Sequence, residues 1–359
     1  MSIARRLLNG YRSIQYKVAG RKKNGVLVPG VLCSHEPFEE SINHGDVVHP
    51  CVRFIEEGFL GHKWWMVYTP YYAANDKTEN PILCYSNSKE PEPPVNWHVF
   101  CQVQGQPEIG YNSDPTLLYD NESLFVIWRE NLTPRCEDAG YIRACFAARV
   151  QADGMGQAFG PLVGTNDFEE DPEVSPTFFK SKGGIYKCYA MHLKFHSEFI
   201  SKLPSLIRKP VSTVASILDL LGFWSQQKSY GIAQWDSNEL AVLFNYNRTV
   251  QFTNCNFLYR PWHMDFFEWE DKLYAIVQTN QCNADVCLAV SEDGINFRFY
   301  KKPLMTNATC GKMGIYKPTG GVIDGFFYLY YTAQNIDNRK LNKMYMTKIE
   351  FCKVIKQIQ

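Results

Sequence analysis

The stretch Arg260-Pro-Trp-His-Met-Asp-Phe-Phe-Glu-Trp-Glu-Asp-Lys-Leu-Tyr-Ala-Ile-Val277 decides the fold, because its plan recurs along the chain. It contains a polar cluster, a short apolar strand, an acidic turn and a second apolar strand. Four further copies of this plan lie within residues 48–68, 113–128, 174–189 and 316–330. Self-similarity built from short strands is typical of a β-propeller, in which each repeat forms one blade. The sequence therefore predicts an all-β fold, a five-bladed β-propeller.

One position of the repeat is polar in every copy. Alignment on the second strand makes these residues equivalent: His49, Asp114, Ser175, His263 and Lys317. By subtraction they are 65, 61, 88 and 54 residues apart. The first strand of each blade lines the central channel of a propeller and begins at one mouth, so we expect the five side chains to surround a single funnel. Packing alone would be satisfied by small or apolar residues there, and this makes the funnel the candidate functional site.

The long spacing between the third and fourth copies indicates an insertion in blade three, at residues 195–227. Within it, apolar residues follow the i, i+3, i+4, i+7 pattern of an amphipathic helix, and Gly222 is a plausible stop. The residues of this stripe are Val214, Ile217, Leu218 and Leu221. The sequence predicts a helical insertion with four possible roles: packing on a blade edge, covering the funnel, a homodimer contact or a membrane-surface contact.

The remaining segments flank the propeller. Residues 1–40 are predicted to form an N-terminal extension, residues 41–351 the propeller and residues 352–359 a C-terminal tail. Gly25–Leu32 is a candidate strand that would pair with the last blade, whose final strand is expected at residues 343–351. Such closure would remove a sheet edge that is otherwise open to aggregation.

The composition excludes some partners. Lysine plus arginine (37) equals aspartate plus glutamate (37), and this balance argues against a nucleic acid or an anionic membrane as partner. The 12 cysteines show no short-spaced framework and no zinc spacing, so we expect neither a metal nor another cofactor. The sequence has no secretory signal and no apolar run of transmembrane length, which predicts a cytoplasmic location.

Carboxylates at the funnel indicate the chemistry. Cleavage of a glycosidic bond needs one carboxyl group to protonate the leaving oxygen and another to activate water or attack carbon. The candidate catalytic acids are Asp114, Asp265 and Glu173. For Asp114, Glu173 and Asp46 the alternative role is a strand-end hydrogen bond to backbone amides. The candidate substrate-binding residues are His49, Ser175, His263, Lys317, Trp262 and Asp46. Asp265 shares a strand face with His263, so the two form either a base with its orienting group or an ion pair.

Two of these motifs carry a resemblance. With Asp114-Pro115 opening one copy and Trp262-His-Met-Asp265 another, residues 41–351 resemble the five-bladed propellers of glycoside hydrolase family 43. That family has a general-base Asp before the first-blade Pro, a pKa-modulating Asp in the second blade and a general-acid Glu in the third. Asp114 matches the second of these. His49 replaces the first, and Glu173 lies one residue too far upstream to match the third.

The resemblance and the polar ring lead to one prediction and two alternatives. We predict a glycosidase-like hydrolase that acts on an oligosaccharide or polysaccharide in the funnel. The first alternative is a non-catalytic glycan-binding or assembly module that kept the funnel and lost the acids. The second is a cytoplasmic enzyme of surface-polysaccharide biosynthesis.

Overall fold

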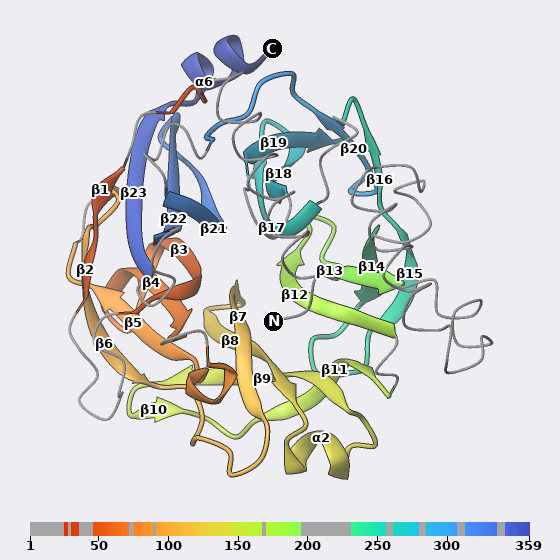
Figure 1. Cartoon of the computed structure of the whole chain (residues 1–359). Helices are drawn as coiled ribbons and strands as arrows, with labels where there is room; N and C mark the ends of the chain where they lie inside the picture. Colours follow the sequence, from red (N-terminus) through yellow and green to blue (C-terminus); the bar gives the residue numbers. More distant parts are fainter. Residues whose placement is uncertain are drawn as a thin grey trace, which may run out of the picture.

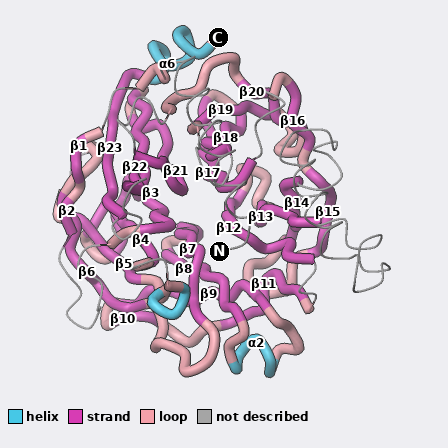
Figure 2. Tube along the Cα trace, in the orientation of Figure 1, coloured by secondary structure: helices cyan, strands magenta, loops and turns pink. Residues whose placement is uncertain are grey.

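The computed structural model describes residues 25–27, 30–35, 46–71, 75–88, 91–166, 170–194, 231–255, 261–279, 285–306, 313–335 and 342–359. In this part of the chain five β-sheets stand around one axis (Figure 1), and strand is the dominant element (Figure 2). The predicted five-bladed propeller is confirmed. The predicted insertion at 195–227, with its helix, lies outside the described residues. No helix in the described ranges is long and apolar enough to cross a membrane.

The innermost strand of each blade faces the axis. These strands are β3 (Val48–Phe59), β7 (Tyr111–Asp120), β12 (Glu170–Lys180), β17 (Pro261–Trp269) and β21 (Met313–Ile323). Each contacts the inner strand on either side of it, and the last contacts the first. The ring is therefore closed.

The first two blades each continue outward as an antiparallel sheet. In blade one, β3 is followed by β4 (His62–Thr69), β5 (Ile82–Ser86) and β6 (Asn96–Gln102), and β2 (Ser34–His35) is parallel to β6 at the edge. In blade two, β7 is followed by β8 (Ser123–Asn131) and β9 (Arg143–Gln151), with β10 (Gly154–Met155) and β11 (Phe159–Thr165) both paired to β9. Two short helices lie beside these blades: the 3₁₀-helix η2 (Asp76–Thr78) and α2 (Pro134–Asp138).

The other three blades follow the same plan. In blade three, β12 is followed by β13 (Tyr186–Lys194), β14 (Gly231–Ser237) and β15 (Asn245–Thr249). In blade four, β17 is followed by β18 (Lys272–Thr279), β19 (Val286–Ser291) and β20 (Asn296–Phe299), and β16 (Gln251–Thr253) is parallel to β20. In blade five, β21 is followed by β22 (Phe326–Asn335), β23 (Asn342–Glu350) and β1 (Val31–Leu32).

Apolar side chains fill the space between neighbouring blades. Five buried clusters exist among the described residues, and each spans two adjacent blades, as Trp65 and Val126 do for blades one and two. Face-to-face packing of sheets explains why the middle strands are buried on both faces. Four tryptophans at most 1% exposed belong to blades one and two: Trp64, Trp65, Trp97 and Trp128.

The strand β1 completes the outer edge of blade five. Val31 pairs with Met346 and Leu32 with Tyr345 in antiparallel register, so the strand is shorter than the expected Gly25–Leu32. Gly30 precedes it, and a Cβ atom there would lie 2.6 Å from the carbonyl oxygen of Met346. A glycine is needed because the two backbones approach so closely.

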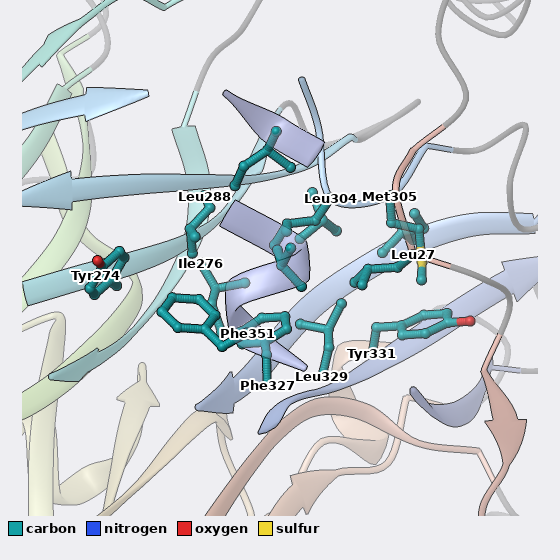
Figure 3. Close-up of a cluster of buried hydrophobic side chains, with 14 of the residues drawn as sticks. Leu27, Tyr274, Ile276, Leu288, Leu304, Met305, Phe327, Leu329, Tyr331 and Phe351 are labelled. Carbon is teal, nitrogen blue, oxygen red and sulfur yellow. The ribbon is translucent and has the colours of Figure 1, made fainter. Parts of the chain in front are cut away.

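Residues 352–358 of the expected C-terminal tail belong to helix α6 (Phe351–Ile358). Its apolar side is buried in the core between blades four and five through Phe351, Val354 and Ile358. Figure 3 shows Phe351 beside Phe327 and Ile276 in this cluster. The helix is therefore part of the propeller's packing.

Candidate active site at the propeller axis

The backbone is strained at the repeat position in four blades. His49, Asp114, Ser175 and Lys317 have φ values of 51°, 48°, 56° and 34°. Each precedes a proline, and the pairing register shifts at each of these points. Proline cannot donate to the ladder, and an irregularity of this kind re-aims a side chain. A non-glycine residue in the left-handed region costs about 1 kcal/mol or more, and such strain is typical of functional sites.

Blade four departs from this pattern. Met264 replaces the proline, and His263 is not among the positive-φ residues of the described chain. Its register shift lies earlier, between Pro261 and His263. The histidine nevertheless reaches the same cluster: its ring centroid lies 5.6 Å from that of His49 and 4.6 Å from that of Tyr316.

Asp114 is the centre of this cluster. Arg129 Nη2 lies 2.9 Å from Asp114 Oδ2, while His49 Nε2 and Lys317 Nζ lie 3.3 and 3.6 Å from Oδ1. The hydroxyl of Tyr316 is 3.2 Å from His49 Nε2. Three predicted site residues (His49, Asp114 and Lys317) are thus brought into direct contact, and His263 adjoins them.

Several polar atoms of the cluster have no hydrogen-bond partner within the described part of the chain. They are His49 Nδ1, both ring nitrogens of His263, Lys317 Nζ and Asp114 Oδ1. The parent residues are only 1–6% exposed. Buried polar atoms nearly always have a hydrogen-bond partner, so a group of donors and acceptors without hydrogen bonds indicates a place for a polar ligand.

Burial and charge set the protonation states. Burial opposes ionisation of Asp114, but His49, Arg129 and Lys317 outweigh it and hold the pKa of this carboxyl below its usual range. Burial lowers the pKa of His49 to about 3 and that of His263 well below its ordinary value. At neutral pH both imidazoles are therefore neutral, and Arg129 holds Asp114 in its ionised form.

A second acid, Glu79, lies next to this cluster. It follows η2 in the connection between β4 and β5 and is 5% exposed. Its side chain hydrogen-bonds Ser113, whose Oγ also accepts from Arg129 Nη2 at 3.1 Å. Burial, followed by the negative charge of Asp114, raises the pKa of Glu79 well above its ordinary value. Its Oε2 has no partner among the described residues.

Asp265 occupies a different position. Arg53 donates to both of its oxygens, at 2.9 and 2.6 Å, and Thr319 Oγ1 donates to Oδ2 at 2.6 Å. The backbone N–H groups of Gly320 and Phe266 donate to it as well. These donors come from blades one, four and five, so the carboxylate joins three blades and both of its oxygens are occupied.

The other predicted site residues are spread around the cluster. Asp46 accepts from the backbone N–H groups of Tyr71 and Asn342, which is the strand-end alternative considered for it, and burial raises its pKa to about 6. Ser175 has the left-handed backbone of the repeat position and is buried. Trp262 is half-buried, with its ring centroid 6.3 Å from that of His263. Glu173 lies in β12, but its side chain is outside the described part.

Sequence reasoning missed Glu79, Arg129 and Tyr316. Arg129 pairs with Ser113 across β7 and β8, so a cross-strand register of blade two could have pointed to it. Tyr316 directly precedes Lys317. Glu79 has no counterpart in the other repeats and gives no such signal. Among the described residues no group of three or more His, Cys, Asp and Glu side chains is arranged to hold a metal ion.

Comparison with known proteins shows that the structure of this chain is similar to several solved structures. No family model and no curated protein matches the sequence. An N-acetylgalactosamine deacetylase from F. plautii, solved with blood group B trisaccharide, is 15% identical with a TM-score of 0.69 over 92% of this chain and 97% of its own. A GH43_1 enzyme from Xanthomonas citri complexed with xylose is 11% identical with a TM-score of 0.55 over 93% of each chain.

A third similar structure is the β-xylosidase RS223, which is 11% identical with a TM-score of 0.56 over 86% of this chain and 93% of that one. The chain has the fold of the GH43 propellers. At these identities the likeness concerns the fold alone, and the roles of individual residues have to be argued from the site itself.

Proposed function

We propose that this protein is a carbohydrate-active hydrolase that acts on an oligosaccharide or polysaccharide at the axial cluster. The observation that carries the proposal is the pairing of Glu79 with Asp114. Both are buried beside Arg129 and Ser113, yet their surroundings shift their pKa values in opposite directions. Two carboxyl groups whose pKa values are shifted in opposite directions provide one acid and one base at the same pH.

In the proposed reaction each group has a role. Asp114 stays ionised, and its Oδ1 accepts a proton from water or from a substrate hydroxyl. Glu79 stays protonated and donates from Oε2 to the leaving atom. His263 and Lys317 hydrogen-bond the hydroxyl groups of the sugar through nitrogen atoms that have no hydrogen-bond partner in the described part of the chain. We assign Asp265 to holding the blades together, in place of the catalytic role expected from the sequence.

Hydrolysis of an amide on an amino sugar is a second candidate. The similarity to the deacetylase extends over nearly the full length of both chains. The cluster also contains two neutral imidazoles and a lysine around its carboxylate, and such groups stabilise the oxyanion that forms when water attacks an acyl carbon. The same two acids would serve this reaction, with Glu79 protonating the leaving amine.

One experiment tests both reactions. The purified protein is incubated with a panel of neutral and N-acetylated oligosaccharides, and new reducing ends and free acetate are measured in parallel. Reducing ends identify a glycosidase and acetate identifies a deacetylase. Glu79→Gln and Asp114→Asn should each lower turnover by about 100-fold or more, the usual effect of losing an acid–base group.

The control is Glu108→Gln, which changes an exposed carboxylate between blades one and two. It should leave turnover unchanged. If no product forms from any substrate and a glycan binds the two acid variants as well as the unaltered protein, the hydrolase proposal is wrong. The non-catalytic glycan-binding alternative would then stand.

A further inference from the structure

A second concave site lies between blade four and helix α6, away from the axis. Its cavity of about 840 Å³ is within the range of ligand sites. Trp269, on its wall, lies six residues beyond His263 along β17, which at strand rise is about 20 Å from the axial cluster. The side chains that matter here are Trp269, Lys272, Arg298, Tyr300, Lys301 and Lys356.

The groove is cationic. Lys272, Arg298, Lys301 and Lys356 are all exposed and line it, while Glu270 is the single acidic side chain among the lining residues. Across the described ranges, no ion pair joins any of the four cations to a carboxylate. Positive charges left without partners on a concave surface attract an anionic ligand.

Aromatic rings form the rest of the wall. Trp269 and Tyr300 are half-buried, so part of each ring faces the groove. Trp269 is held edge-on against Phe351, with the ring centroids 6.1 Å apart, and the Arg298 guanidinium lies 5.7 Å from the centroid of Tyr300. Rings held in this way offer flat apolar faces to the C–H faces of a sugar.

The frame of the groove is fixed. Helix α6 carries Lys356 on its exposed side, while Val354 packs in the core together with Phe351, which Figure 3 shows. The backbone N–H of Lys302 donates to the carbonyl of Ile358 at 3.1 Å, which ties the end of the helix to the segment that bears Lys301. The two lysines therefore stand on rigid elements, as a binding site requires.

We propose that this groove binds an anionic carbohydrate, a glycan segment that bears carboxylate groups such as those of uronic acids. The site is separate from the axial cluster and does not depend on catalysis there. A glycan is favoured over a nucleic acid because the chain as a whole has a formal net charge of zero and so lacks the general attraction that phosphate backbones exploit.

The test measures binding of hexagalacturonate by calorimetry, with xylohexaose and a single-stranded thymidine oligonucleotide of the same charge as comparison ligands. The double variant Lys301→Glu/Lys356→Glu should weaken hexagalacturonate binding by about tenfold or more, because it replaces attraction by repulsion. The matched control is Lys77→Glu/Lys343→Glu, which alters two exposed lysines outside the groove and should leave the affinity unchanged. Xylohexaose should bind weakly or not at all at this site.

Trp269→Leu tests the contribution of stacking on the sugar separately from that of charge. It should weaken hexagalacturonate binding several-fold, while a midpoint of thermal unfolding close to that of the unaltered protein shows that the fold is kept. The proposal is overturned by absent hexagalacturonate binding, by equal affinity in the groove and control variants, or by oligonucleotide binding as tight as that of the glycan. Glu79→Gln should not change this binding, so failure of the hydrolase proposal is distinguishable from failure of this one.

Discussion

At the scale of single residues, the environment of Asp114 determines what the site can do. Its carboxylate is held by Arg129 on one oxygen and approached by His49 and Lys317 on the other. Burial keeps the two imidazoles neutral at neutral pH, so Arg129 and Lys317 are the cations that keep Asp114 ionised. The protonation state on which the proposed reaction depends is therefore set in part by Arg129, a residue of the second strand of blade two, which makes the shorter of the two cation contacts.

Replacement of this guanidinium gives a test by pH. In Arg129→Met the pKa of Asp114 should rise, so the acid limb of the kcat/KM profile should move to higher pH than in the unaltered protein. The low folded-state pKa also contributes stability that is present above the unfolded pKa and lost as pH falls, and this contribution should shrink. Breaking a buried ion pair costs about 3–5 kcal/mol, measurable by urea unfolding at neutral pH.

Arg149→Met is the matched control, since Arg149 is an exposed residue of β9. It should leave both the pH profile and the unfolding free energy unchanged. An unmoved acid limb in a folded Arg129→Met protein would show that Asp114 is not the group that must be ionised.

The sequence predicted the residues that surround the axis better than it predicted the candidate acids. His49, Asp114, His263 and Lys317 were found because one strand position repeats, and repetition is visible in the sequence. Glu79 was not found because it stands in a connection unique to blade one. The contacts of Asp265 were not predicted either: it shares a strand face with His263, but Arg53 of blade one and Thr319 of blade five reach it, and such contacts depend on packing that no local pattern shows.

At the scale of elements, the start of the inner strand is the feature that recurs. Four blades place a proline after a left-handed residue and shift the register there. The irregularity turns the preceding side chain toward the axis at a cost in backbone strain. The proline pattern therefore indicated the position of the axial cluster as well as the fold.

Ser175 allows this strain to be measured. Glycine adopts a positive φ without penalty, whereas alanine does not. Ser175→Gly should therefore be more stable than Ser175→Ala by about 1 kcal/mol in urea unfolding. At Ser123, which is also buried in a strand but is not among the positive-φ residues, the order should be reversed, with the alanine variant more stable. The same order at both positions would contradict the strained backbone at the repeat position.

At the scale of the whole molecule, five clusters between blades and one joining strand hold the ring. The strand β1 contributes only Val31 and Leu32, yet it covers the outer edge of β23. An uncovered edge would present unpaired backbone groups to other molecules. The protection of this outer edge therefore depends on a short contact between segments that are far apart in the sequence.

Gly30→Ala tests this closure. The added Cβ would meet the backbone of Met346, so β1 should separate from β23, with loss of about 2 kcal/mol of stability and greater aggregation on heating. Thermal unfolding with light scattering measures both. Gly105→Ala is the control, because a Cβ there meets no atom within 4 Å. Identical scattering curves for the two variants would show that β1 is dispensable.

The placement of the indole rings has an optical consequence. Four of the eight tryptophans are sealed inside blades one and two, whereas Trp269 faces the groove of blade four. Intrinsic fluorescence therefore includes a component from blades one and two, which should emit at short wavelength while those two blades stay packed. A soluble quencher such as acrylamide should reach Trp269 in preference to those four, and a glycan seated in the groove should shield it. The emission spectrum thus separates loss of the first two blades from occupancy beside the fourth without any added label.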